Sequence, residues 1–163
     1  MSELKSAGKR VEIRKKGAFN IQEIYTALKD TIKTKLKYKF IEQKQESEVK
    51  KTGKKIKMIF TGERPVDDFV RFNVQVELLF ENINKTKIDG KMLDDGDVKA
   101  IFNAKLEFDY KNRWNADPLS KFLLFVYTKF VLRYKIKDVY ERKLMEENNA
   151  IMDAFKEQVG LLV

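Results

Sequence analysis

Two long stretches of alternating apolar and polar residues constrain the fold of this chain more than any other feature. The apolar members of the first stretch are Val70, Phe72, Val74, Val76, Leu78 and Phe80. Those of the second are Val98, Ala100, Phe102, Ala104, Leu106, Phe108 and Tyr110. Successive side chains of a strand point to opposite faces, whereas a helix would distribute these residues around its whole surface. The pattern therefore predicts two long strands, each with one buried and one solvated face, and it favours antiparallel pairing.

The first part of the chain contains a short strand and a helix by the same kind of evidence. Residues 11–14 alternate between apolar and charged types, which is typical of a strand. Asn20 stands where a helix N-cap is expected, directly before an amphipathic stripe that runs to about Lys35. Residues 1–10 show no periodicity and are predicted to be a flexible tail, so a single folded domain is predicted over 11–163.

Turn signals separate further alternating segments. Residues 36–41 alternate and the segment to Val49 is polar, which predicts an edge strand. The glycine-containing turn 51–54 joins it to alternating residues at 56–61, and together these predict a hairpin. Asp89 and Gly90 have the residue types of a second tight hairpin turn. The acidic stretch 94–97 also has the composition of a turn, and its spacing does not match the ligand positions of an EF-hand calcium loop. It is therefore predicted to be a plain turn.

Two helices are predicted after the second long strand. Asp117 and Pro118 are the residue types expected at the N-cap and at the first position of a helix. The helix that they begin, over about 119–131, is apolar on most sides and is predicted to be largely buried. A last, amphipathic helix is predicted over about 136–159.

These elements together predict an α+β fold. It is an antiparallel β-sheet of about five strands, with one N-terminal helix and two C-terminal helices packed on one face. The order of elements, without any accompanying motif, resembles that of helix-grip folds of the START and Bet v 1 kind. This resemblance implies a binder of a hydrophobic ligand, in which some of the 12 phenylalanines and 6 tyrosines would line a cavity under the helices.

The composition excludes most catalytic and metal-binding chemistry. The chain has no cysteine and no histidine. Disulfides, thiolate nucleophiles, imidazole ligands and the usual general base near neutral pH are therefore ruled out. Neither the P-loop nor the dinucleotide-binding spacing of glycines occurs. We expect a protein that is not an enzyme and that has no catalytic residues, no cofactor and no metal site.

No segment of the sequence has the length and composition of a membrane span. The longest nearly apolar window, 119–132, contains two lysines and is shorter than the roughly 20 residues that a membrane helix needs. The N-terminus shows no signal-peptide pattern. We therefore expect a cytoplasmic protein, or a virion component if the chain is viral.

Basic residues are concentrated in the first third of the chain. The formal net charge is +9, of which +10 belongs to residues 1–60 and −1 to the remainder. The candidate contacts to phosphates or to an acidic partner are Lys29, Lys33, Lys37, Lys51, Lys54 and Lys55. These lysines make sequence-nonspecific nucleic-acid binding one alternative function. The other explanation is a lysine-rich proteome, in which lysine fills any exposed position.

The sequence favours an assembly protein over the nucleic-acid and hydrophobic-ligand alternatives. A helix that is apolar on most sides must be buried from several directions, either by its own domain or by another subunit. The candidate interface residues on and after this helix are Phe125, Phe130 and Tyr134. We therefore expect a non-catalytic structural subunit that binds other protein subunits, as a homo- or hetero-oligomer, in a larger cellular or viral complex.

Overall fold

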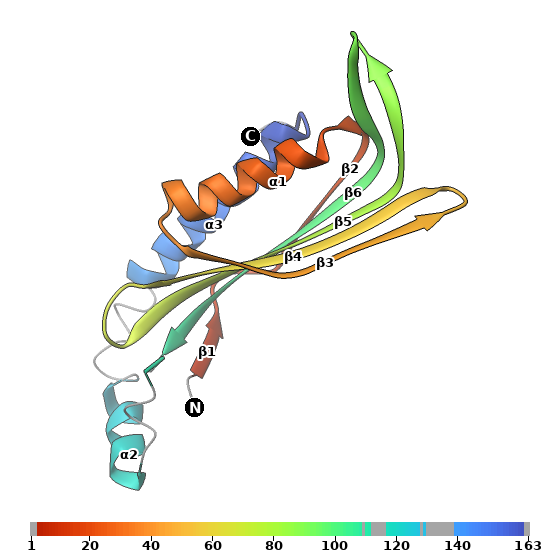
Figure 1. Cartoon of the computed structure of the whole chain (residues 1–163). Helices are drawn as coiled ribbons and strands as arrows, with labels where there is room; N and C mark the ends of the chain where they lie inside the picture. The colour runs from red at the N-terminus through yellow and green to blue at the C-terminus, as the bar shows by residue number, and fades with distance from the viewer. Residues whose placement is uncertain (1–2, 109, 112–116, 128, 130–138, 162–163) are drawn as a thin grey trace.

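The computed structural model describes residues 3–108, 110–111, 117–127, 129 and 139–161. The strands in this part of the chain are β1 (Glu3–Ser6), β2 (Val11–Phe19), β3 (Lys39–Lys50), β4 (Gly53–Pro65), β5 (Val70–Ile88) and β6 (Lys91–Phe108). The helices are α1 (Ile21–Asp30), the π-helical segment η1 (Thr31–Lys35), α2 (Pro118–Val126) and α3 (Glu141–Gln158). Figure 1 shows their arrangement.

One antiparallel sheet organises the described part of the chain. The order of its strands is β1-β6-β5-β4-β3, and β2 also pairs with β6. β1 and β2 share one edge of β6, with β1 opposite residues 105–108 and β2 opposite residues 94–102. The two long alternating stretches lie in β5 and β6, which pair with each other along almost their whole length. The predicted α+β fold with an antiparallel sheet is therefore confirmed.

The first described residues pair with the sheet, although the sequence predicts a flexible tail over 1–10. Residues 3–6 form β1 against β6, and the Ala7 N–H donates a hydrogen bond to the Ala104 carbonyl over 2.9 Å. Backbone groups make this pairing, so it leaves no periodic pattern of apolar side chains in the sequence. For residues 3–6 the prediction of a flexible tail is wrong.

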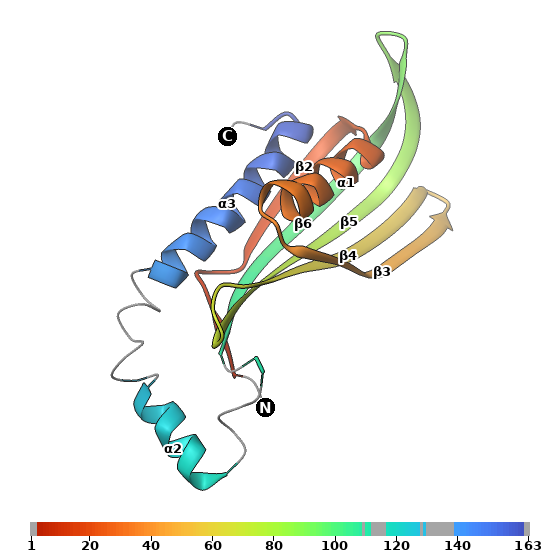
Figure 2. The same cartoon turned by 60° about the vertical axis from the view of Figure 1, so that its left-hand side comes forward.

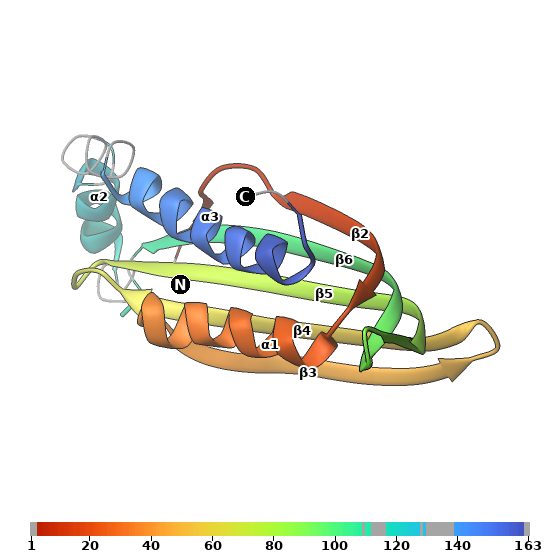
Figure 3. The ribbon, with the colours of Figure 1, turned by 90° about the horizontal axis from the view of Figure 1, so that it is seen from above.

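α1 and α3 cover one face of the sheet. They lie side by side over the strands (Figure 3). The Asn20 side chain accepts a hydrogen bond from the Glu23 N–H over 3.1 Å, which confirms the predicted N-cap of α1. The predicted extension of this helix to Lys35 is present as η1. The fully buried apolar side chains of this layer are Ile24, Leu28, Ile32, Leu144, Ile151 and Phe155.

The apolar sides of the strands fill the space under these helices. Phe60, Phe72, Phe80 and Phe102 of the strands are among the largest fully buried side chains. Full burial of a phenylalanine stabilises a fold by roughly 1.5–3 kcal/mol relative to an exposed one. Four hollows on the described surface all open to solvent and are lined mainly by polar side chains. None of the four is an enclosed apolar cavity of the kind that the helix-grip resemblance implies.

α2 lies beyond the end of this helix layer. Figures 1 and 2 show it apart from the sheet and from the other two helices. Its exposed apolar side chains are Leu119, Phe122, Leu123 and Phe125. In the single chain these four side chains are exposed, so the prediction that this helix is largely buried is wrong for them. An apolar pattern on most sides of a helix predicts burial, but it does not say which molecule provides the cover.

The hairpin between β5 and β6 turns at Asp89 and Gly90, as predicted. These residues have φ angles of 51° and 80°, as in the two-residue turns that match the twist of the flanking strands. The second predicted turn, over 94–97, is wrong because these residues lie within β6. They pair next to a bulge in β5, where the register shifts between Glu81 and Asn84. A bulge and a turn draw on the same residue types, so composition does not distinguish them.

The buried Asp94 joins the bulged hairpin to the helix layer. Only 6% of Asp94 is exposed. Its carboxylate accepts a hydrogen bond from the Ile21 N–H at the start of α1 over 3.2 Å and pairs with the Lys85 ammonium over 2.6 Å. A carboxylate at a helix N-terminus is favoured because the unpaired N–H groups there carry partial positive charge.

A polar cluster fastens α3 to the sheet at the opposite end of the helix layer. Arg64 of β4 donates two hydrogen bonds to the Glu147 carboxylate of α3, over 2.6 and 2.9 Å. Tyr38 donates to the same carboxylate, and burial together with this bond raises the pKa of its hydroxyl. Tyr140 donates to Asp67, and burial followed by this bond raises the pKa of Tyr140 to about 12.

Replacing Gly96 by alanine should destabilise the fold by about 1–3 kcal/mol. A Cβ at this position would lie 2.7 Å from the Glu81 carbonyl oxygen and 2.8 Å from that of Asn82, and backbone atoms cannot rotate away. Gly90→Asn is the control, because nothing lies within 4 Å of its Cβ position and asparagine tolerates positive φ. Urea unfolding followed by circular dichroism measures both, and equal losses of stability would contradict the packing argument.

Stability should fall between about pH 10 and about pH 12, in part through Tyr38 and Tyr140. Both hydroxyls have a pKa raised above the ordinary 10.0 in the folded state. The unfolded state therefore loses these protons first as the pH rises, and the free energy of unfolding decreases. Tyr38→Phe and Tyr140→Phe should each give a shallower slope when urea unfolding is measured from about pH 9 to about pH 11. Identical slopes in the wild type, Tyr38→Phe and Tyr140→Phe would contradict this expectation.

Candidate functional site

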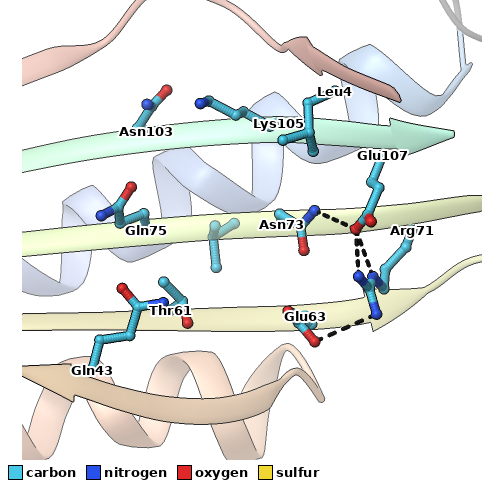
Figure 4. A pocket seen from close by; sticks show the side chains of 11 residues that line it. Leu4, Gln43, Thr61, Glu63, Arg71, Asn73, Gln75, Asn103, Lys105 and Glu107 are labelled. Carbon is cyan, nitrogen blue, oxygen red and sulfur yellow. Dashed lines mark hydrogen bonds and ion pairs between the residues drawn. The ribbon is translucent and has the colours of Figure 1, made fainter. Parts of the chain in front are cut away.

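The face of the sheet opposite the helices is mainly polar, and no described helix covers it. Every second residue of the central strands points to this face. Thr61 of β4, Gln75 of β5 and Asn103 of β6 are direct cross-strand neighbours and form one row across three strands. This row is part of a groove of about 320 Å³ (Figure 4). The groove is lined by Leu4, Gln43, Thr61, Glu63, Arg71, Asn73, Val74, Gln75, Asn103, Lys105 and Glu107.

One end of the groove is fixed by an ion pair between neighbouring strands. Arg71 donates hydrogen bonds to Glu107 from Nε over 2.8 Å and from Nη2 over 2.5 Å. Asn73 donates to the same carboxylate oxygen over 2.9 Å, and Arg71 also lies 3.5 Å from Glu63. Glu107 is only 7% exposed, so these bonds are poorly screened by water. The arrangement holds Arg71 and Asn73 in fixed positions (Figure 4).

The other end of the groove is uncharged. Gln43, Thr61, Gln75 and Asn103 carry amide or hydroxyl groups there (Figure 4). None of the four makes a side-chain hydrogen bond to another described residue, so each can still donate and accept.

Beyond the groove, the open face carries alternating charges that form ion pairs. Lys57 lies 3.4 Å from Glu77, and Lys99 lies 3.8 Å from Glu12. Exposed pairs of this kind stabilise by at most about 1 kcal/mol each. Their main effect is to keep the open face close to electrical neutrality, which argues against a phosphate-binding surface there.

The six candidate lysines of the basic first third do not form one patch. Lys29 lies over the Tyr25 and Phe40 rings, with its ammonium 5.8 and 5.6 Å from their centroids. Lys33 and Lys37 are exposed close to it in the chain, before β3 begins. The remaining members, Lys51, Lys54 and Lys55, lie at and after the turn that ends β3.

The length of β3 separates these two groups of lysines. β3 has 12 residues, and a strand rises about 3.3 Å per residue, so its ends lie roughly 40 Å apart. A continuous phosphate-binding face would need all six lysines on one surface. The structure instead places them in two groups at opposite ends of the β3–β4 hairpin.

The candidate interface residues fall on and after α2. Phe125 is 56% exposed on α2, while Phe130 and Tyr134 lie outside the described residues. Asp117 accepts a hydrogen bond from the Ser120 N–H over 2.8 Å, which confirms the predicted N-cap, and this bond lowers the pKa of the Asp117 carboxyl. After α2, the Tyr127 ring packs edge-on against Phe69, with centroids 5.4 Å apart.

The described residues offer no arrangement for metal chemistry and no membrane span. They contain no group of three or more Asp, Glu, His or Cys residues placed to hold a metal ion. No described helix is both long and apolar enough to cross a membrane. The groove and α2 are two features of the described surface that are suited to binding.

Neither a family model nor a curated protein matches this sequence. The exposure of α2 and the geometry of the groove therefore indicate what this protein binds.

Sequence reasoning missed the groove residues. Arg71, Gln75, Asn103 and Glu107 were visible only as the solvated positions of two alternating strands. Which of these positions become neighbours depends on the register between strands, and the alternation alone does not set that register.

Replacing Glu107 by glutamine should destabilise the protein by roughly 1–3 kcal/mol, because it leaves the Arg71 guanidinium without its closest carboxylate. Glu77→Gln is the matched control on the same face, since its pair with Lys57 is more exposed and should contribute less than about 1 kcal/mol. Urea unfolding at neutral pH measures both variants. A Glu107→Gln effect no larger than that of the control would contradict the role given to this ion pair.

Proposed function

We propose that this protein is a non-catalytic assembly subunit that binds another protein subunit through α2. The observation that carries the proposal is the exposure of Leu119, Phe122, Leu123 and Phe125 on one short helix, at 68%, 61%, 47% and 56%. Single exposed apolar residues are common on protein surfaces, whereas a cluster on one element marks an interaction site.

The energetics of a short helix support this proposal. α2 has nine residues, and isolated helices shorter than about 12–15 residues are only marginally stable in water. Covering the exposed parts of its four large side chains would contribute roughly 1 kcal/mol each. Cover by a partner would therefore offset part of the cost of holding this segment helical.

The size of the exposed cluster indicates that the interface extends beyond α2. Four half-exposed side chains supply on the order of 400 Å² from one partner. Specific interfaces usually bury about 800 Å² on each side. A partner that covers α2 must therefore also contact neighbouring surface of this subunit.

The positive charges near α2 indicate the surface chemistry that a partner should have. Lys121 is exposed on α2, and the Lys129 ammonium lies 5.2 Å from the centroid of the Phe125 ring. An apolar groove with acidic residues at its rim would complement both features. A second copy of the chain is the first partner to test, because it requires no further protein.

Phe122→Glu combined with Phe125→Glu should convert an oligomer into a monomer, because the interface would have to bury two carboxylates. Val49→Glu is the control, since Val49 is 83% exposed on β3, away from α2. Light scattering at about 50 mM and about 500 mM salt, with absorbance at 260 nm, gives the mass and any bound nucleic acid. We expect a salt-resistant oligomer for the wild type and for Val49→Glu, and a monomer for the double variant.

Two results would contradict the proposal. A wild-type monomer with the same mass as the double variant would show that α2 does not mediate self-association. A wild-type monomer carrying nucleic acid that high salt removes would instead favour the basic groups of the first third of the chain.

A further inference from the structure

We propose that the groove on the open face binds an uncharged, hydroxyl-rich ligand, namely a glycan chain. The groove has a volume of about 320 Å³, which lies at the lower end of the range for small-molecule sites. Its lining comes mainly from β4, β5 and β6, the central strands of the sheet, rather than from loops. Side chains on a paired sheet are held in place before the ligand arrives, which lowers the entropic cost of binding.

The charges in the groove select a neutral ligand. Its two basic residues, Arg71 and Lys105, are balanced by Glu63 and Glu107. Arg71 is already bonded to Glu107 and lies beside Glu63 (Figure 4). An anionic ligand could reach Lys105 freely, but it would have to compete with Glu63 and Glu107 for the Arg71 guanidinium. A cationic ligand would have to compete with Arg71 for these two carboxylates. A neutral ligand needs neither exchange.

The row of amide and hydroxyl groups in the groove favours a ligand that carries hydroxyl groups. Thr61, Gln75 and Asn103 follow one another across three strands that are spaced about 4.8 Å apart, and Gln43 lines the same groove. Each of these groups can donate and accept a hydrogen bond, as a sugar hydroxyl can. A chain of sugar units therefore matches the row over its whole length. At the charged end of the groove, Leu4 lies opposite Glu107 and is 56% exposed, so it offers apolar contact to the C–H face of a sugar ring that extends there.

The position of the groove distinguishes a glycan from a peptide. An extended peptide usually binds a sheet by adding a strand to a free edge, where main-chain hydrogen bonds supply the affinity. Along the groove, β4, β5 and β6 have paired strands on both sides, apart from residues 103–104 of β6 between β1 and β2, so nearly all of their main-chain groups are already occupied. Recognition in the groove must come mainly from side chains, which suits a ligand whose hydrogen-bonding groups lie around its rings.

The test is a titration of the isotope-labelled full chain with maltohexaose, cellohexaose and chitohexaose, up to about 10 mM, observed by NMR. We expect saturable shifts of the side-chain NH₂ signals of Gln75 and Asn103 with at least one of the three probes. Gln75→Ala combined with Asn103→Ala should weaken this binding at least about tenfold. Gln45→Ala on β3 is the control, because Gln45 is exposed and does not line the groove.

Several outcomes would overturn the proposal. One is the absence of a saturable shift with all three glycans, and another is equal affinity in the wild type and a folded double variant. Shifts caused only by dextran sulfate and lost in high salt would identify an anion surface instead. Shifts caused only by an uncharged peptide would identify a protein-binding face. The wild-type signals decide the question even if the double variant does not fold, and the α2 variants should leave the titration unchanged.

Discussion

The pairing of β5 with β6 is the constraint on which the rest of the structure depends. Their register places Val74 opposite Ala104 and Leu78 opposite Ala100, so the apolar side chains of both strands share one face. A slip of one residue would move all of these side chains of one strand to the open face. The small alanines lie beneath the helix layer, and Phe155 of α3 packs on Phe102 with ring centroids 5.8 Å apart. The helix layer therefore follows from this register.

Because α1 and α3 cover one face of the sheet, only the other surfaces of the protein remain for binding. The core side is filled by large side chains, and the Arg64–Glu147 cluster fastens α3 across it. An apolar ligand site would have to displace part of this core. The uncovered polar face and the apolar α2 remain, and they differ in chemistry. The polar face offers fixed hydrogen-bonding groups, whereas α2 offers apolar side chains whose burial by a partner is favourable.

Much of the fold was predictable because its signals are local. The two alternating stretches, the N-cap at Asn20 and the turn at Asp89 each depend on residues close together in the chain. The prediction failed at β1 and at residues 94–97 for non-local reasons. β1 exists because β6 offers it a free edge, and residues 94–97 are held in β6 by the bulged β5 opposite them.

The candidate site was less predictable than the fold. The apolar character of α2 and the exposure of Phe125 agree with what an interface requires, although the helix itself was expected to be largely buried. The lysines of the first third resembled one basic surface only because they are close in sequence. The groove depends on the register of three strands, and no pattern within any one strand encodes it.

Hydrogen exchange along α2, measured over a dilution series of the wild-type protein, tests most directly whether another subunit covers this helix. A short exposed helix exchanges its amides almost as fast as an unfolded peptide. If a second copy covers α2, the amides of residues 122–126 will be protected at high concentration and will lose that protection on dilution, while the amides of β5 and β6 stay protected throughout. Rapid exchange of residues 122–126 at every concentration would contradict the account.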